Sequence, residues 1–232
     1  MRDLKVYTTY PHSCSYLADQ EATTLFVDPR QPMDKVLYSN LSLLGFRRSG
    51  SHVYRPHCSH CEACIPARIP VAQFEPRRGQ TRTWKRNQDL RVRRSDDLRD
   101  EEAFQLYCRY IELRHYDGDM YPPDTEQYES FLNDAWDCTH YYRFYDDSRL
   151  IALAVVDELQ DGMSAIYTFF DPEADKRSLG TFAILWQIER VRALGLEYLY
   201  LGYWIRGCKK MSYKSEFRPL ELYVKNRWTV IG

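Results

Sequence analysis

The order of helical and strand-like periodicities after residue 98 constrains the fold of this chain more than any other feature. Apolar residues recur at helical spacing over 98–115 and over about 125–136, which predicts two helices. Three strand-like runs follow at 140–145, 150–157 and 163–170, joined by hairpin turns. A helix over 182–195, a buried strand over 197–203, a short basic segment and a strand over 220–224 complete the order. We therefore expect an α+β fold.

A three-stranded meander followed by a strand–helix–strand crossover resembles the plan of the acetyltransferase-like (GNAT) fold. In that fold the mixed sheet splays beside the crossover helix and opens a cleft for an acyl donor. A shift in composition near Ser95-Asp-Asp-Leu98 marks a boundary. We expect a smaller cysteine-containing N-terminal region over 1–95 and a GNAT-like transferase domain over 96–232.

The region before this boundary contains few long elements. Residues 1–32 read as loops with short strands, among them 25–27. Apolar residues at helical spacing over 33–44, followed by Gly45, predict an amphipathic helix with a glycine end signal. A turn is expected over 46–50. A strand is expected over 67–71, and Pro70 places it at a sheet edge.

Three cysteines occur within seven residues, at Cys58, Cys61 and Cys64. A two-residue gap lets successive thiolates converge on one metal ion. Cys14, in a Pro-His-Ser-Cys turn, is the candidate fourth ligand. Such soft ligands suit zinc or an iron–sulfur cluster rather than magnesium or calcium. The alternative is a loop of reduced thiols without metal.

The charge of the chain is unevenly placed although its net value is only −1. Between residues 77 and 94 there are eight Arg or Lys and one acid, Asp89. Such a patch favours a polyanion, and Trp84 within it would offer a surface on which a base or ribose stacks. The alternative is an ordinary solvated helix face. Nucleic acid is the partner that this patch favours.

A second basic segment leaves the buried strand and runs from about 203 to 219. It carries Arg206, Lys210, Lys214 and Arg218, with Tyr203, Trp204 and Tyr213 between them. Cations beside a strand end suit a carboxylate or phosphate ligand. The alternative is again a solvated loop. The turn over 176–181 resembles a pyrophosphate loop but has a single glycine, so coenzyme A is not expected.

The class of protein is limited by what the 232 residues lack. The sequence has no apolar run of 18 residues and no opening segment of the signal-peptide type, so no membrane is expected. Seven cysteines, an odd number, do not favour a disulfide scaffold. A cytoplasmic location fits best.

Several ordered motifs resemble those of the aminoacyl-tRNA–protein transferase family in its short bacterial form, the aspartate/glutamate leucyltransferases. The resemblance covers nearly the whole chain. In the first half the matching text is Tyr38-x2-Leu41, Gly45-Phe-Arg-Arg-Ser-Gly50, Tyr54-Arg-Pro-x-Cys58-x2-Cys61-x-Ala-Cys64-x-Pro-x-Arg68, Phe74-x-Pro-x-Arg78 and Arg86-Asn-x-Asp-Leu90. In the second half it is Tyr167-x-Phe-Phe-Asp-Pro172, Ser178-Leu-Gly180, Gly202-Tyr-Trp-Ile205 and Lys210-Met-x-Tyr-Lys-x2-Phe-x-Pro219.

The resemblance implies transfer of leucine from leucyl-tRNA to the α-amino group of proteins that begin with Asp or Glu, which marks them for the N-degron pathway. Aminoacyl-tRNA is then the co-substrate. In eukaryotic relatives N-terminal cysteines bind an iron–sulfur cluster, but here their Cys-x2-Cys is replaced by Cys14-Ser-Tyr-Leu17. Donation of arginine, a coenzyme A acetyltransferase and a metal-dependent RNA-binding module without catalysis are the alternatives.

The two basic segments acquire roles from this chemistry. The acceptor carboxylate would be read by a cation among Arg206, Lys210, Lys214 and Arg218. The tRNA phosphates would be held by Arg77, Arg78, Arg82, Lys85 and Arg86. Because an aminoacyl ester is already activated, no covalent intermediate is needed, and the sequence assigns no general base.

Overall fold

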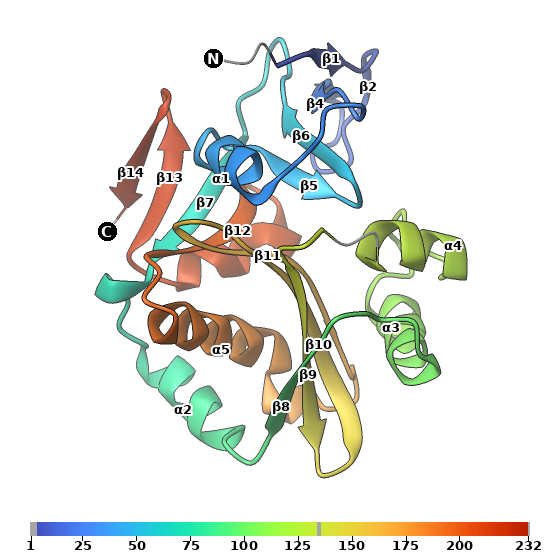
Figure 1. Cartoon of the computed structure of the whole chain (residues 1–232), viewed down its shortest axis with the longest axis vertical. Helices are drawn as coiled ribbons and strands as arrows, with labels where there is room; N and C mark the ends of the chain where they lie inside the picture. Colours follow the sequence, from blue (N-terminus) through green and yellow to red (C-terminus); the bar gives the residue numbers. More distant parts are fainter. Residues whose placement is uncertain (1–3, 134–135, 232) are drawn as a thin grey trace.

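The computed structural model describes residues 4–133 and 136–231, which build a large mixed sheet with a smaller sheet beside it. The strands of the large sheet follow the order β14-β13-β7-β12-β11-β10-β9-β8 (Figure 1). Their bounds are β7 Cys64–Pro70, β8 Arg91–Ser95, β9 Thr139–Asp146, β10 Arg149–Glu158, β11 Gly162–Phe170, β12 Tyr198–Ile205, β13 Leu220–Val224 and β14 Arg227–Ile231. All neighbouring pairs are antiparallel except β11 and β12.

The expected meander and crossover are confirmed. Strands β9, β10 and β11 pair in sequence, and helix α5 (Leu179–Ala193) then returns the chain so that β12 lies parallel to β11. A parallel pair requires such a crossover because a tight turn cannot reverse the chain twice. The GNAT-like plan read from the sequence is the plan of the structure.

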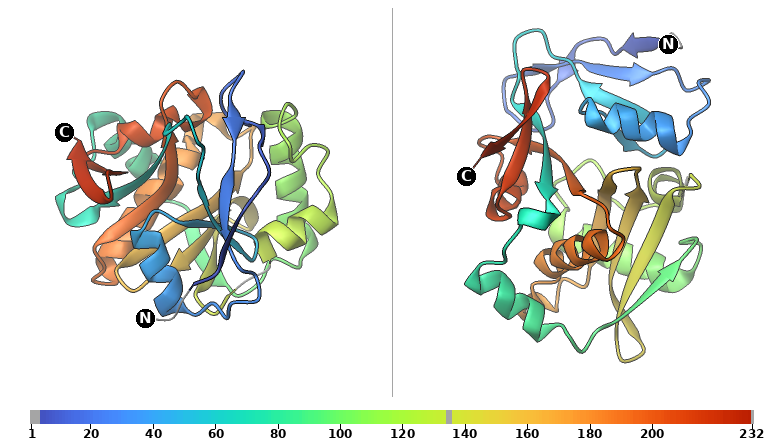
Figure 2. Two further views of the ribbon diagram at one scale, coloured as in Figure 1. Left: turned by 90° about the horizontal axis from the view of Figure 1, so that it is seen from above. Right: turned by 60° about the vertical axis from the view of Figure 1, so that its left-hand side comes forward.

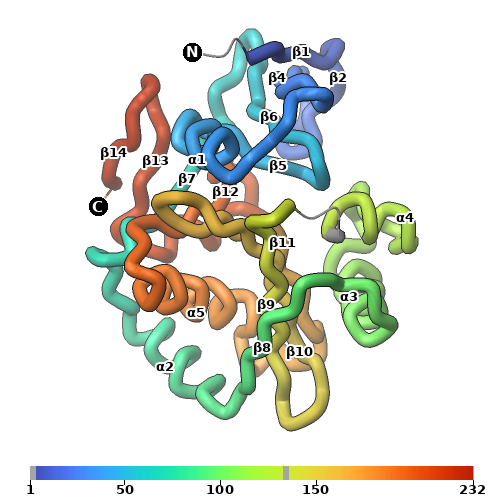
Figure 3. Tube along the Cα trace, viewed as in Figure 1, coloured from blue at the N-terminus to red at the C-terminus, as the bar shows by residue number. Residues whose placement is uncertain are grey.

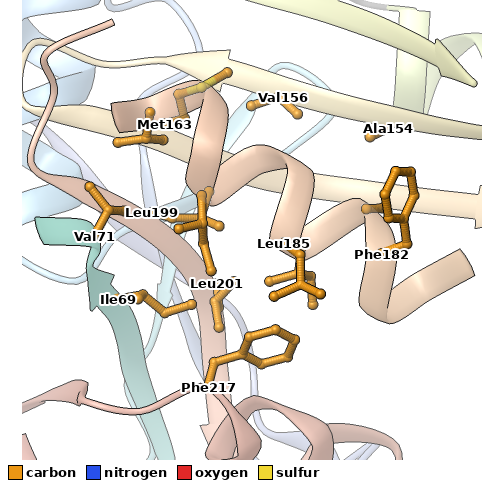
Figure 4. Close-up of a cluster of buried hydrophobic side chains, with 14 of the residues drawn as sticks. Ile69, Val71, Ala154, Val156, Met163, Phe182, Leu185, Leu199, Leu201 and Phe217 are labelled. Carbon is orange, nitrogen blue, oxygen red and sulfur yellow. The ribbon is translucent and has the colours of Figure 1, made fainter. Parts of the chain in front are cut away.

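Helices cover both faces of the sheet, and β10 therefore buries apolar side chains on both of its faces. Ala152, Ala154 and Val156 face the α5 layer, whereas Leu153 and Val155 face helix α3 (Glu101–Arg114). Figure 4 shows the first of these clusters, in which Phe182 and Leu185 of α5 lie over the sheet. Helix α2 (Arg78–Arg86) lies beside α5 (Figure 1). Along the described residues, every helix is too short or too polar to cross a bilayer.

The first part of the chain forms a second, four-stranded sheet with order β1-β4-β6-β5. Its bounds are β1 Val6–Thr8, β4 Thr24–Val27, β5 Arg47–Ser49 and β6 His52–Pro56, with helix α1 at Lys35–Leu43 and a small β2–β3 hairpin of His12–Ser13 and Glu21–Ala22. Val27, Tyr38 and Phe46 bury themselves against Tyr200 of β12. Figures 2 and 3 show this sheet lying over one end of the large sheet.

Four details differ from the sequence-based expectations. The expected edge strand is β7, which lies inside the sheet between β12 and β13; β13 pairs only with its Arg68 and Ala67, so Pro70 lies past that pairing. The expected turn over 46–50 contains strand β5, and the chain turns after it at Gly50. The helix over 125–136 is α4 (Thr125–Tyr128) followed by a wider turn over Glu129–Asn133, and 134–135 lie outside the described residues. Strands β8 and β14 were not expected.

The expected boundary at residue 95 stays a prediction. Hydrogen bonding is continuous across it, because β8 before the boundary pairs with β9 after it. Strand β7, also from the first part, pairs with both β12 and β13. The chain before residue 95 therefore contributes strands to the large sheet as well as forming its own.

One buried ion pair joins the two sheets. Arg48 of β5 donates from Nε to Asp157 Oδ2 at 2.6 Å and from Nη2 to Oδ1 at 2.8 Å, and both side chains are fully buried. Thr139 Oγ1 also donates to Asp157, and Arg48 Nη1 donates to the carbonyl of Gly50. Every charged atom of the pair thus has a partner, which is the condition for burying two charges.

Removing one charge from this pair should destabilise the protein strongly. We expect Asp157→Asn to lower the free energy of unfolding by about 3–5 kcal/mol, because it leaves the Arg48 guanidinium buried without a counter-ion. Urea unfolding followed by tryptophan fluorescence measures the change. The control is Lys35→Met, which breaks the partly exposed Lys35–Glu158 pair and should cost no more than about 1 kcal/mol. Equal losses in the two variants would contradict this reading of the Arg48 pair.

Candidate functional site

The parallel strands β11 and β12 separate soon after they meet. The structure pairs Gly162 with Tyr198, Met163 with Leu199 and Ser164 with Tyr200; past that point β12 pairs with β7 alone. Gly162 is required at the closed end, because a Cβ there would lie 2.1 Å from the carbonyl oxygen of Tyr198. The two strands therefore form a fork that is closed at Gly162 and Tyr198 and open beyond Ser164 and Tyr200.

Arg47 of β5 fills the narrow part of the fork. Its Nη1 donates to Ser164 Oγ at 2.6 Å and its Nη2 to the carbonyl of Ala165 at 2.6 Å, both on β11. On the β12 side Gly202 has a φ of +78°, and a Cβ there would lie 3.1 Å from the guanidinium. The missing side chain of Gly202 thus makes room for Arg47.

Lys214 is a second cation at the fork. It lies on the 3-10 segment η4 (Lys209–Glu216), is 4% exposed, and donates from Nζ to the carbonyl of Tyr203 on β12. Burial, and next the charge of Arg47, lower the pKa of Lys214 to about 7. Among the described residues, no carboxylate forms an ion pair with Arg47 or with Lys214.

Segment η4 bridges the open end of the fork. Lys210 Nζ pairs with Asp117 in the loop after α3 at 3.1 Å. At its other end, the carbonyl of Glu216 accepts from Gln80 Nε2 of α2 at 3.1 Å. The segment is therefore held at both ends while Lys214 points inward.

The structure separates the four cations that were expected to bind the acceptor. Lys214 lies at the fork, whereas Arg206 and Lys210 are exposed, and Lys210 already has an acidic partner in Asp117. Arg218 is half-buried and donates from Nε to the carbonyl of Ser215. Only geometry distinguishes Lys214 from the other three, since all four occur in one short basic stretch.

The cations expected to bind tRNA lie at and along α2. Arg78, Arg82 and Lys85 recur at helical spacing on its exposed face, while the buried Gln80 and Thr83 face the protein. Arg77 pairs with Glu216 at 3.3 Å, and Arg86 donates to the carbonyl of Lys176. The structure thus shows an exposed basic face on α2, and nucleic-acid binding by this face stays a prediction.

Trp84 does not present its ring to solvent beside these cations, as stacking on a base would require. It is half-buried and packs on the core, with its ring 5.5 Å from that of Phe182 on α5. The turn over 176–181 is held by α2, because the buried Asn87 donates to the carbonyl of Arg177. These contacts attach α2 to the start of the crossover helix.

The four cysteines expected to bind metal lie in one neighbourhood without forming a ligand set. Burial, and next the nearby Cys14 and Cys58, raise the pKa of the Cys64 thiol to about 12, which shows that these cysteines lie close together. Over 4–133 and 136–231, no group of three or more His, Cys, Asp or Glu side chains is arranged to hold a metal ion. The residues present, Cys61 included, do not fit a metal in this conformation, and a metal site stays a prediction.

The position of the cysteine loop relative to the fork is nevertheless informative. Cys64 begins β7 and pairs with Ile205 at the end of β12, so the loop lies at the open end of the fork. Sequence reasoning named these cysteines but not Arg47, which occurs in the motif Gly45-Phe-Arg-Arg-Ser-Gly50. The motif was the available signal, but it does not show which of its two arginines reaches the fork.

Three solved structures are similar to this chain at low sequence identity, so they show the fold alone. The C-terminal domain of a putative lysylphosphatidylglycerol synthetase from Agrobacterium fabrum aligns with a TM-score of 0.51 and 13% identity, over 73% of this chain and 58% of that one. The L-PGS of Bacillus licheniformis aligns with a TM-score of 0.52 and 12% identity, over 72% of this chain and 62% of that one. FemX aligns with a TM-score of 0.50 and 9% identity, over 94% of this chain and 88% of that one.

Sequence comparisons are much closer. Family models described as the N terminus and the C terminus of arginine-tRNA-protein transferase match residues 12–82 and 102–224. An aspartate/glutamate leucyltransferase of Pseudomonas fluorescens (strain Pf0-1) is 58% identical over 99% of this chain and 97% of its own length. One of Pseudomonas aeruginosa (strain UCBPP-PA14) is 55% identical over 98% and 97%. With both family models and near-complete relatives matched, the chain belongs to the aminoacyl-tRNA–protein transferase family, among the aspartate/glutamate leucyltransferases.

Proposed function

We propose that this enzyme transfers leucine from leucyl-tRNA to the α-amino group of proteins that begin with Asp or Glu, and that the transfer takes place in the fork between β11 and β12. The observation that carries the proposal is the pair of cations, Arg47 and Lys214, which enter the fork without an acidic partner among the described residues. The names of the relatives support the donor and the acceptors. The modified proteins would enter the N-degron pathway, in the cytoplasm.

The fork suits aminolysis of an ester. Leucine on tRNA is already activated, so the enzyme has to align the amine with the ester carbonyl, accept a proton and stabilise an oxyanion. An α-amino group titrates near pH ~8, so about a tenth of the acceptor is already a neutral nucleophile at pH ~7 and a modest base suffices for the rest. Coenzyme A has no part in this reaction.

Of the four cations expected from the sequence, we assign Lys214 to the acceptor carboxylate. Its ammonium is buried, and an anion that binds beside it would relieve the cost of that burial. Arg206, Lys210 and Arg218 are then peripheral. Recognition by a buried cation rejects an uncharged side chain strongly, because the charge would be left without a partner.

The tRNA would lie along α2. Its exposed face presents Arg78, Arg82 and Lys85 to solvent, and cations that meet phosphates bind without regard to sequence. The contact between Gln80 of α2 and Glu216 of η4 joins this surface to the segment that carries Lys214. A tRNA held on α2 is therefore next to the fork.

The first prediction tests the activity itself. With radiolabelled leucyl-tRNA, label should move to peptides that begin with Asp or Glu and not to a peptide that begins with Ala, with no requirement for coenzyme A. Scintillation counting of the separated peptides measures the transfer. Transfer from arginyl-tRNA instead would correct the donor, and tRNA binding without any transfer would favour an RNA-binding module.

The second prediction concerns α2. The double substitution Arg82→Glu with Lys85→Glu should weaken leucyl-tRNA binding by about tenfold or more at low salt. It should also make the salt dependence of binding shallower, because the variant contacts fewer phosphates and so releases fewer counter-ions. Filter binding at several salt concentrations measures both. The matched control, Lys225→Glu with Arg227→Glu, makes the same charge change at exposed positions of the β13–β14 hairpin. An equal loss in the control would exclude a specific surface on α2.

The third prediction uses the pKa of Lys214. Since this pKa is about 7 in the folded protein, far below that of an unfolded lysine near ~10.4, the folded state binds fewer protons between these values. The free-energy cost of burying the Lys214 ammonium therefore destabilises the folded protein fully below pH ~7, and this cost falls as the pH rises towards ~10. Unfolding free energies from urea titrations at pH 7 and pH 9.5 should show wild type gaining stability relative to Lys214→Met, by roughly 2–4 kcal/mol. The absence of a relative gain would contradict a lowered pKa of Lys214 in the folded protein.

A further inference from the structure

Arg47 belongs to one sheet and acts in the other. Its backbone lies in β5, where it pairs with Tyr54 of β6, yet its guanidinium lies between β11 and β12. Strand β11 supplies two hydrogen-bond acceptors and β12 supplies a glycine that leaves space. The protein thus holds this side chain in place from three strands, which is more than a solvated arginine needs.

The charge of Arg47 is not compensated. A guanidinium has five N–H donors, and the described residues accept from two of them, through the neutral oxygens of Ser164 and Ala165. By contrast, Arg48 has Asp157 and Arg68 has Glu221 as acidic partners. A half-buried cation with donors to spare and no counter-ion favours an anionic ligand.

A second uncompensated cation lies nearby. Lys214 is buried, and the charge of Arg47 contributes to the lowered pKa of its ammonium, which places the two side chains within electrostatic range of each other. Two like charges in a low-dielectric setting repel, so a shared anion would stabilise both. Its site would be next to the point where β11 and β12 separate.

We propose that the Arg47 guanidinium binds the side-chain carboxylate of the acceptor's N-terminal Asp or Glu and so determines the specificity of the enzyme for acidic acceptors; this inference rests on the function proposed above. The planar fork of the guanidinium matches a carboxylate, and its two bonds to β11 set its orientation. Lys214 supplies the second positive charge, because a carboxylate bound beside it favours the protonated form of its amine. The acceptor's α-amino group, one or two carbons beyond the carboxylate-bearing atom, then lies at the fork where the ester is presented.

A carboxylate is favoured over a tRNA phosphate as the occupant. The exposed cations of α2 form a separate basic surface that suits a phosphate backbone. Arg47 is instead half-buried and Lys214 is buried, and each donates a hydrogen bond to a strand of the fork. Two cations held side by side in this way suit one small anion attached to the reacting amine.

The test compares acceptors that differ only in charge. For Arg47→Gln we expect kcat/KM to fall by about 100-fold or more with peptides that begin with Asp or Glu, mainly through KM, because the paired charge is lost. Peptides that begin with Asn or Gln should change little, so that the Asp/Asn ratio approaches one. The KM for leucyl-tRNA should stay the same. Arg47→Lys should keep part of the preference, since it keeps the charge without the planar fork.

The matched control is Arg55→Gln on the neighbouring strand β6, where the arginine donates to the carbonyl of Leu44 outside the fork. It should leave the Asp/Asn ratio unchanged. The proposal for Arg47 is overturned if Arg47→Gln retains the wild-type ratio, or if its defect is a raised KM for leucyl-tRNA that is equal for all acceptors. If Arg47→Gln does not fold, the ratio for Arg47→Lys decides: a tenfold fall supports the proposal and no change overturns it.

Failure of this inference is distinguishable from failure of the proposed function. If wild type transfers leucine to acidic peptides but the variants keep the preference, only the role of Arg47 is wrong. If wild type transfers no leucine to any peptide, the proposed function itself is wrong.

Discussion

The separation of β11 and β12 after Ser164 and Tyr200 is the constraint on which the rest of the structure depends. Two parallel strands that stop pairing leave backbone groups without strand partners, and buried backbone groups must find others. The protein meets this need with side chains from elsewhere: Arg47 donates to the carbonyl of Ala165, and Lys214 donates to the carbonyl of Tyr203. The groups that satisfy the fork are thus cations, and the place where the sheet opens becomes a positively charged site.

Strand β5 explains how a small N-terminal sheet would take part in the reaction that we propose for the fork in the large sheet. Successive side chains of a strand point to opposite faces, so Arg47 and Arg48 leave β5 in different directions. Arg48 pairs with Asp157 and anchors the strand by a fully buried ion pair. Arg47, one residue earlier, is thereby held in register with the fork. One arginine stabilises the arrangement and its neighbour is available to a ligand.

The N-terminal region and the large sheet form a continuous structure around the site. Strand β7 brings the cysteine loop beside Ile205 at the end of β12, and the following α2 is attached to η4 through Gln80 and Glu216. Strand β7 thus places the cysteine loop at the open end of the fork, and α2 contacts the segment that carries Lys214.

Hydrophobic periodicity by itself determined the meander, the crossover helix α5 and the parallel partner β12, because the burial of alternate or every third to fourth side chain is a local property of the chain. The sequence also determined that two basic segments exist and, through ordered motifs, which family the chain resembles. It could not determine that β7 lies inside the sheet despite Pro70, because that depends on where β13 stops pairing. Nor could it select Lys214 from four similar cations or find Arg47, since burial and the absence of a counter-ion arise only when distant strands meet. Tertiary structure decided which charges are left for a ligand, because the energy of a charge depends on its surroundings and not on its place in the chain.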